Sequence, residues 1–150
     1  MKTVIQRVKY ASVTIEGKVT AHIDQGLLIL LGITTDDDRT AADWLARKAA
    51  ALRIFDDENG VMNKDIKEID GQILVVSQFT LLASYKKGNR PSYIHAAAHE
   101  TAIPLYEHFI AQLSALTNKP IATGTFGADM KIELLNDGPV TICMDTNHKE

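Results

Sequence analysis

The sequence predicts an α+β fold in which helices pack on one side of largely antiparallel β-sheets. Three observations predict it: β-branched runs with turn signals in residues 2–31, two stretches with helical spacing of apolar residues, and two apolar runs near the C-terminus. The chain has 150 residues, of which 45% are hydrophobic and 23% are charged. Both fractions are typical of a globular protein, so we expect a single domain over residues 1–150.

The first part of the chain is expected to form strands. Glu16-Gly17-Lys18 separates two β-branched runs, which is typical of a hairpin turn. The run from Leu27 to Leu31 is apolar throughout, so this strand is expected to be covered on both faces. The predicted strands cover residues 2–8, 12–15, 19–23 and 27–31.

Two amphipathic helices are predicted. The first covers residues 38–53 and follows the acidic run Asp36-Asp37-Asp38, which suits the positive end of a helix dipole. The second is expected to have Thr101 as its N-cap and Pro104 in its first turn, where a missing N–H is tolerated. Its apolar side consists of Leu105, Phe109, Leu113 and Leu116.

Three further strands are predicted, together with their connections. Residues 56–60 are expected to form a loop, and a buried strand over residues 73–76 runs directly into Ser77-Gln78-Phe79-Thr80. The last two strands cover residues 130–135 and 140–144. Between them, Asn136-Asp137-Gly138-Pro139 is interpreted as a turn; the alternative is a cis bond that aims main-chain carbonyls into a pocket.

Composition and charge exclude several classes of protein. Sixteen basic and nineteen acidic side chains give a net charge of −3, which argues against a nonspecific duplex binder. Cys143 is the only cysteine, so no intramolecular disulfide is possible and a reducing cytoplasm fits best. The longest apolar stretch, residues 27–31, is far shorter than a membrane span, so no membrane contact is expected.

Two motifs for chemistry are weak when they are judged from the residues alone. His95 and His99 have the spacing of zinc ligands on one helix face, but Ile103 breaks the longer metalloprotease pattern, so no metal or cofactor is expected. Ser77 lacks the flanking glycines of a nucleophile elbow. The hydroxyls of Ser77 and Thr80 are therefore interpreted as bonding local backbone at a strand end.

The loop of residues 85–91 contains three cations, Lys86, Lys87 and Arg90, and no acid. Cations can neutralise phosphates while neighbouring tyrosines stack on bases, so such a loop suits single-stranded nucleic acid. Composition alone favours an ordinary solvated loop.

Six segments, taken together and in order, resemble the D-aminoacyl-tRNA deacylase family of bacteria and eukaryotes. Tyr93 departs from that family, which commonly has phenylalanine at this place. The segments span nearly the whole chain and are Gln6-Arg7-Val8, Leu52-Arg53-Ile54-Phe55, Ser77-Gln78-Phe79-Thr80-Leu81, Lys87-Gly88-Asn89-Arg90-Pro91-Ser92, Gly124-Thr125-Phe126-Gly127-Ala128-Asp129-Met130 and Asn136-Asp137-Gly138-Pro139-Val140-Thr141.

The resemblance implies a homodimer of β/β/α domains that hydrolyses the ester between a D-amino acid and the terminal adenosine of tRNA. Because glycine is achiral, removal of glycine mischarged on tRNA is expected as well. A cis Gly138-Pro139 bond from one subunit would enter the active site of the other. There its carbonyl oxygens would bind the substrate ammonium group, and L side chains would collide with backbone.

The resemblance also implies roles for individual residues. Ser77, Gln78, Phe79 and Thr80 would form the catalytic segment. Gly138, Pro139, Met130 and Ala128 would bind substrate, and Lys86, Lys87, Arg90 and Phe79 would contact tRNA.

Two mechanisms and two other classes of protein stay open. Thr80 could attack the ester as a nucleophile, or the 2′-hydroxyl of the terminal ribose could assist a water molecule. We favour the second mechanism, because no recognisable base accompanies Thr80. The other classes are a noncatalytic RNA-binding domain, like the proofreading module of archaeal threonyl-tRNA synthetases, and a small-molecule esterase that uses Ser77 with a histidine.

Overall fold

The computed structural model describes residues 1–149. In this part of the chain, the main sheet has the strand order β2-β1-β3-β6-β7, and β8 also pairs with β1. A small second sheet joins β4 (Phe55–Asp56) to β5 (Met62–Lys64). The elements of the main sheet are β1 (Lys2–Ile15), β2 (Lys18–Ile23), β3 (Gly26–Gly32), β6 (Gln72–Ser77), β7 (Ala122–Thr123) and β8 (Lys131–Asp145). The helices are α1 (Arg39–Ala50), the 3₁₀ helix η1 (Phe79–Leu82) and α2 (His99–Thr117).

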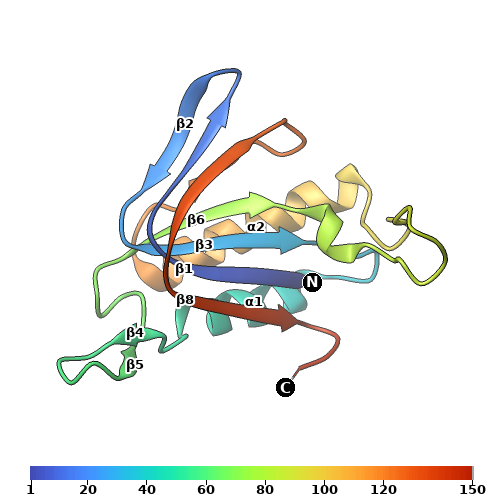
Figure 1. The fold of residues 1–150 in the computed structure, drawn as a ribbon. Helices are drawn as coiled ribbons and strands as arrows, with labels where there is room; N and C mark the ends of the chain where they lie inside the picture. Colours follow the sequence, from blue (N-terminus) through green and yellow to red (C-terminus); the bar gives the residue numbers. More distant parts are fainter. Residues whose placement is uncertain (150) are drawn as a thin grey trace.

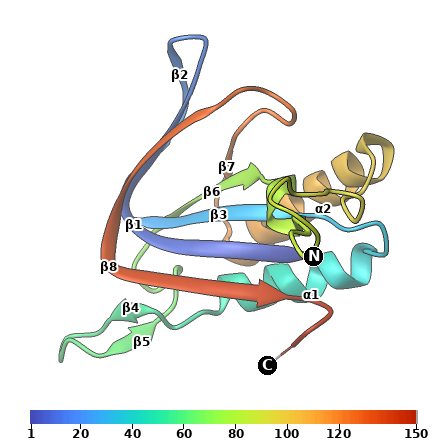
Figure 2. The same ribbon diagram turned by 45° about the vertical axis from the view of Figure 1, so that its right-hand side comes forward.

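Two long strands give the molecule its layers. The first half of β1 pairs with β3 and its second half with β2, whereas β8 pairs with both halves of β1. Both strands bend, so their outer halves rise with β2 away from the part of the sheet that the helices cover (Figures 1 and 2). The result is the β/β/α layering and the α+β class expected from the sequence.

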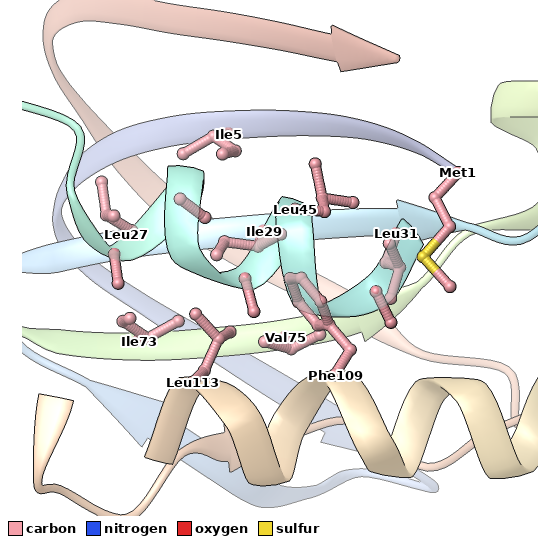
Figure 3. Packing of buried hydrophobic residues seen from close by; sticks show 14 of the residues in the cluster. Met1, Ile5, Leu27, Ile29, Leu31, Leu45, Ile73, Val75, Phe109 and Leu113 are labelled. Atoms are coloured by element: carbon pink, nitrogen blue, oxygen red, sulfur yellow. The ribbon is translucent and has the colours of Figure 1, made fainter. Parts of the chain in front are cut away.

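Apolar side chains fill the space on each face of the central strands. On the helix side, residues of β1, β3 and β6 pack against Leu45 of α1 and against Phe109 and Leu113 of α2 (Figure 3). On the other face, a second cluster lies under the bent halves of β1 and β8. Strand β3 contributes to both clusters, which confirms the prediction of a strand covered on both faces. Each fully buried aliphatic side chain stabilises the fold by about 1.5–3 kcal/mol.

The sheet is mixed, which the sequence did not predict. Strand β1 is antiparallel to all three of its partners, but the β3–β6 and β6–β7 pairs are parallel. Parallel neighbours need a crossover connection, and here α1 and α2 make the two crossovers. Strands β4, β5 and β7 were not predicted, and the expected loop at residues 56–60 is part of the β4–β5 hairpin.

Two predictions about strands are wrong. Residues 2–8 and 12–15 belong to one strand, β1. Asn136-Asp137-Gly138-Pro139 is not a turn between two strands, because Asn136 pairs with Val8 and Thr141 with Gln6. Residues 137–140 therefore form a bulge in β8 opposite one residue of β1, Arg7. The strand β8 does not reverse there, because it pairs with β1 both before and after the bulge.

Helix α1 begins at Arg39, one residue after the predicted start, and Asp38 is its N-cap: the carboxylate of Asp38 accepts a hydrogen bond from the backbone N–H of Ala41 at 2.8 Å. It ends at Ala50, three residues before the predicted end. The predicted start of the second helix is wrong. The N-cap of α2 is Ala98, and Thr101 lies inside the helix.

Two further predictions about α2 also need correction. Pro104 is the sixth helical residue, beyond the first turn, and because it has no N–H the carbonyl of Glu100, an exposed residue, lacks its usual helical donor. Leu116 is 36% exposed rather than part of the buried side. His95 precedes the helix, so it does not share a helix face with His99.

Candidate active site

A cavity of about 630 Å³ opens beyond the C-terminal end of β6. Five of the predicted site residues line it: Ser77, Gln78 and Phe79 from the end of β6 and the start of η1, and Ala128 and Met130 from the segment before β8. The rest of the wall is mainly apolar, with His99, Tyr93 and Asp129 as its other polar residues. The apolar lining includes Leu31, Ile33, Ala97, Ala102, Phe126 and Ile132.

Backbone hydrogen bonds determine which amides of this segment are free. The N–H of Gln78 donates to the carbonyl of Leu31 at 2.8 Å, which extends the β3–β6 pairing by one bond. The N–H groups of Phe79 and Thr80, at the start of η1, have no hydrogen-bond acceptor within residues 1–149. Of the two residues, Phe79 lines the cavity and Thr80 follows it directly; two adjacent free amides of this kind can stabilise the oxyanion that forms when an acyl group is attacked.

Thr80 is exposed and does not line the cavity. Its hydroxyl accepts a hydrogen bond from the side-chain amide of Gln78. An amide is not a base, so this contact does not activate the hydroxyl for attack. In the described part of the chain, no histidine or carboxylate is hydrogen-bonded to Thr80 or to Ser77, although His99 shares the cavity with Ser77.

Close packing places Met130 and Phe126 in the cavity wall. A Cβ atom at Gly124 would lie 2.5 Å from the sulfur of Met130, so a larger residue at this position would require the Met130 side chain to shift. The ring of Phe126 packs edge-to-face against the rings of His99 and Tyr106, with distances between ring centroids of 5.4 and 5.7 Å. The Tyr106 hydroxyl donates to the carbonyl of Val75 in β6 at 3.0 Å, and burial raises the pKa of Tyr106 to about 12, so it remains a donor.

The basic loop adjoins the cavity without lining it. Two backbone hydrogen bonds between Ser84 and Ser92, of 2.8 and 2.9 Å, close its base. Its cations, Lys86, Lys87 and Arg90, are exposed, and none of them has an ion pair within residues 1–149.

The Gly138-Pro139 peptide bond is cis. Arg7, whose side chain is 9% exposed, holds the bulge that contains it. Its guanidinium donates to the carbonyls of Asp137 at 2.9 Å and Ile54 at 2.7 Å, and to the carboxylate of Asp56 at 3.2 Å. Gly138 has a φ of +129°, which side chains rarely allow, and a Cβ atom there would lie 2.9 Å from the side chain and 3.0 Å from the backbone nitrogen of Val140, so the bulge favours glycine.

Within one chain, this bulge and the cavity lie far apart. The bulge is opposite Arg7, which pairs with Leu27, and Leu27 pairs with Ile73, four residues before Ser77. Four residues along a strand and three strand spacings across the sheet amount to roughly 20 Å. In Figure 1, β8 bends on the left, whereas β6 ends on the right. The structure therefore does not bring Gly138 and Pro139 to Ser77 of the same chain.

The sequence reasoning gave no role to Arg7, Phe126 or Tyr106. For Arg7 a signal was available, because an arginine between alternately buried strand residues needs buried partners. In residues 1–149, no group of three or more histidine, cysteine or acidic side chains is arranged to hold a metal ion. The helices of the same range are too short or too polar to cross a bilayer.

The fold and the cavity define a β/β/α protein with free amides suited to acyl chemistry. The family model described as D-Tyr-tRNA(Tyr) deacylase matches residues 4–145. Proteins called D-aminoacyl-tRNA deacylase from Phocaeicola vulgatus and Flavobacterium johnsoniae are 63% and 57% identical to this chain, each over 100% of both chains. The chain therefore belongs to the D-Tyr-tRNA(Tyr) deacylase family.

Solved structures show the same fold. One titled c-Myc DNA Unwinding Element Binding Protein has a TM-score of 0.90 and 40% identity, covering 97% of this chain and 98% of that one. Another, described as a probable eukaryotic D-amino acid tRNA deacylase, has a TM-score of 0.82 and 15% identity, covering 95% and 97%. At 15% identity, the second likeness concerns the fold alone.

Proposed function

We propose that this protein is a D-aminoacyl-tRNA deacylase, a hydrolase that cleaves the ester between a D-amino acid and the terminal adenosine of tRNA. The observation that carries the proposal is the cavity in which Ser77, Gln78 and Phe79 meet Ala128 and Met130. Full-length relatives with this name support it. The products are a free D-amino acid and reusable tRNA, glycine mischarged on tRNA is a further substrate, and the cytoplasm is the place of action.

The ester carbonyl would lie against Ser77-Gln78-Phe79-Thr80. Because the Gln78 amide is already bonded to Leu31, the N–H groups of Phe79 and Thr80 are left to stabilise the oxyanion. The attacking water would be assisted by the 2′-hydroxyl of the terminal ribose, since Thr80 is bonded to a side-chain amide and not to a base. Ala128 and Met130 would contact the bound substrate, and no cofactor takes part.

The working assembly would be a homodimer in which Gly138 and Pro139 of one subunit complete the cavity of the other. The separation of roughly 20 Å within one chain supports this arrangement. So does Gln6, whose buried side-chain oxygen has no hydrogen-bond partner in residues 1–149. Carbonyl oxygens of the motif would accept hydrogen bonds from the substrate ammonium group, so that an L side chain would collide with backbone.

The activity is tested with matched D- and L-tyrosyl-tRNA. We expect release of D-tyrosine at a rate at least about 100-fold above that of L-tyrosine, the ratio that a collision costing about 3 kcal/mol produces. Scintillation counting of acid-precipitable aminoacyl-tRNA measures both rates. Absence of release would indicate a noncatalytic RNA-binding protein. Equal hydrolysis of D- and L-tyrosyl-tRNA, together with hydrolysis of simple esters, would indicate a small-molecule esterase.

Lys86, Lys87 and Arg90 would contact phosphates near the acceptor end, with Phe79 against the terminal nucleoside. We expect the triple alanine variant to raise the KM for different D-aminoacyl-tRNAs by similar factors. The slope of log KM against log salt should fall by up to about 2 between about 50 and 200 mM salt, since each contact with single-stranded phosphate contributes about 0.7.

The matched control for this prediction replaces three exposed cations elsewhere, Lys18, Arg39 and Arg47, with alanine. It removes the same charge and should leave the salt slope of the wild type nearly unchanged. An equal change of slope in both triple variants would show that net charge, and not this loop, governs tRNA binding.

A further inference from the structure

Three aromatic rings are exposed in and next to the cavity-lining segments. Phe79 is 57% exposed and Tyr93 37%, and both line the cavity, whereas Tyr85, which is 77% exposed, lies in the adjoining basic loop. All three belong to the segment between the end of β6 and the start of α2. Exposed rings gathered in one segment lose the stabilisation of burial, so they indicate a surface that binds something flat and apolar.

Two of these rings form a corner at the cavity. Phe79 and Tyr93 both line it, and their ring centroids are 5.0 Å apart with an angle of 76° between the ring planes. In this edge-to-face arrangement each ring covers little of the other, so a planar group can stack on one ring while its edge meets the second. Nucleobases are such groups, and they stack on protein rings with little dependence on sequence.

The charges beside this corner suit a phosphate chain. Tyr85 begins the loop that carries Lys86, Lys87 and Arg90, which have no ion pair within residues 1–149. Asp129, the acid that lines the cavity, is bonded to Lys131 at 3.0 Å, so part of its charge is neutralised. Exposed rings next to unpaired cations are the combination that binds single-stranded nucleic acid.

The cavity has room for the terminal aminoacyl nucleoside, since about 630 Å³ is within the range of sites for one small ligand. The nucleotide before it must then lie outside, at the mouth. We propose that the base of this penultimate nucleotide stacks on the ring of Tyr93, in the corner that Tyr93 makes with Phe79, which also contacts the terminal nucleoside, so that the protein recognises a single-stranded 3′ end and not the last nucleoside alone. This inference rests on the proposed function for the identity of the RNA.

The test compares D-tyrosyl-adenosine with D-tyrosyl-cytidylyl-adenosine. We expect the added cytidine to raise kcat/KM by about 5- to 100-fold, the effect of stacking one base on a protein ring. A uridine should have a similar effect, whereas an abasic ribose phosphate should give little of the gain. In Tyr93→Ala the ratio of the two kcat/KM values should fall to near 1, and Tyr93→Phe should keep the ratio of the wild type.

Ile94→Ala is the matched control, because Ile94 is 76% exposed, follows Tyr93 directly and does not line the cavity. It should keep the ratio of the wild type. The proposal is overturned if the abasic dinucleotide is as good a substrate as the intact one. It is equally overturned if Tyr93→Ala lowers kcat/KM by the same factor for both substrates.

A binding measurement separates this inference from the deacylase activity. The probe is a hydrolysis-resistant D-tyrosyl amide of the dinucleotide with a fluorescent pyrimidine in the penultimate position. Quenching by the wild type but not by Tyr93→Ala supports stacking, even if no ester is hydrolysed. Hydrolysis of D-tyrosyl-adenosine without such quenching rejects the stacking site and leaves the deacylase activity standing.

Discussion

Hydrolysis of a D-aminoacyl-tRNA that ends in 2′-deoxyadenosine is expected to be about 10²–10⁴-fold slower than hydrolysis of the ribose form, the usual contribution of general acid–base assistance. The reason lies around Thr80, whose hydroxyl accepts a hydrogen bond from Gln78. No histidine or carboxylate is hydrogen-bonded to Thr80 or Ser77 within residues 1–149. Under the proposed function, the 2′-hydroxyl adjacent to the ester would then assist the attacking water.

Single-turnover rates at saturating enzyme concentration measure this effect. Each rate is divided by the rate without enzyme, because the 2′-hydroxyl also affects the intrinsic lability of the ester. Competition with the ribose substrate should show that the deoxy substrate still binds. As the companion variant, Thr80→Ala should retain turnover within about tenfold. The RNA-assisted mechanism would be ruled out by equal rates for both substrates after division by the uncatalysed rates, or by an acyl-enzyme trapped on Thr80.

Replacing Arg7 with methionine is expected to lower the free energy of unfolding by about 2–4 kcal/mol, since buried carbonyls would lose their donor. The guanidinium joins three segments by donating to Ile54 and Asp56 around β4 and to Asp137 in the β8 bulge. Methionine fills much of the space but donates no hydrogen bond. The bulge that carries Gly138 would lose its support, so D-aminoacyl-tRNA hydrolysis should fall as well.

Lys9→Met is the matched control for Arg7→Met. Lys9 pairs with the carboxylate of Asp137 at 3.2 Å, but its side chain is 55% exposed. Exposed ion pairs contribute about 0–1 kcal/mol, so this variant should unfold at nearly the urea concentration of the wild type. Equal destabilisation by the two substitutions would contradict the role assigned to Arg7, as would an Arg7→Met variant with unchanged stability and kcat/KM.

Local signals in the sequence were sufficient for the features that neighbouring residues determine. The N-terminus of α1 at Asp38 is one, because a carboxylate next to the first helical turn can accept a hydrogen bond from one of its free N–H groups, here that of Ala41. The hairpin at Glu16-Gly17 is another, and both residues have positive φ angles of 49° and 77°. The segments that line the cavity were also recognised, because they occur in the order typical of the family.

Features that depend on distant partners could not be predicted. Residues 137–140 have the composition of a turn, but they bulge because β1 continues past them as a partner on both sides. The short strand β7 forms because Leu74 and Val75 of β6 offer a free edge. Pro104 was expected in a first turn, but α2 begins five residues before it. Packing of α2 in the hydrophobic core stabilises the helix although Pro104 donates no backbone hydrogen bond.

By itself, the sequence determined the fold class, the two helices, most of the strands and the residue types that form the cavity. These depend on hydrophobic period, turn residues and capping, all of which act over a few residues. Only the tertiary structure decided that Arg7 supports the bulge, since its partners lie 47 and 130 residues away along the chain. The same holds for the distance between that bulge and Ser77, because strand order and register are set by long-range pairing, which no local pattern encodes.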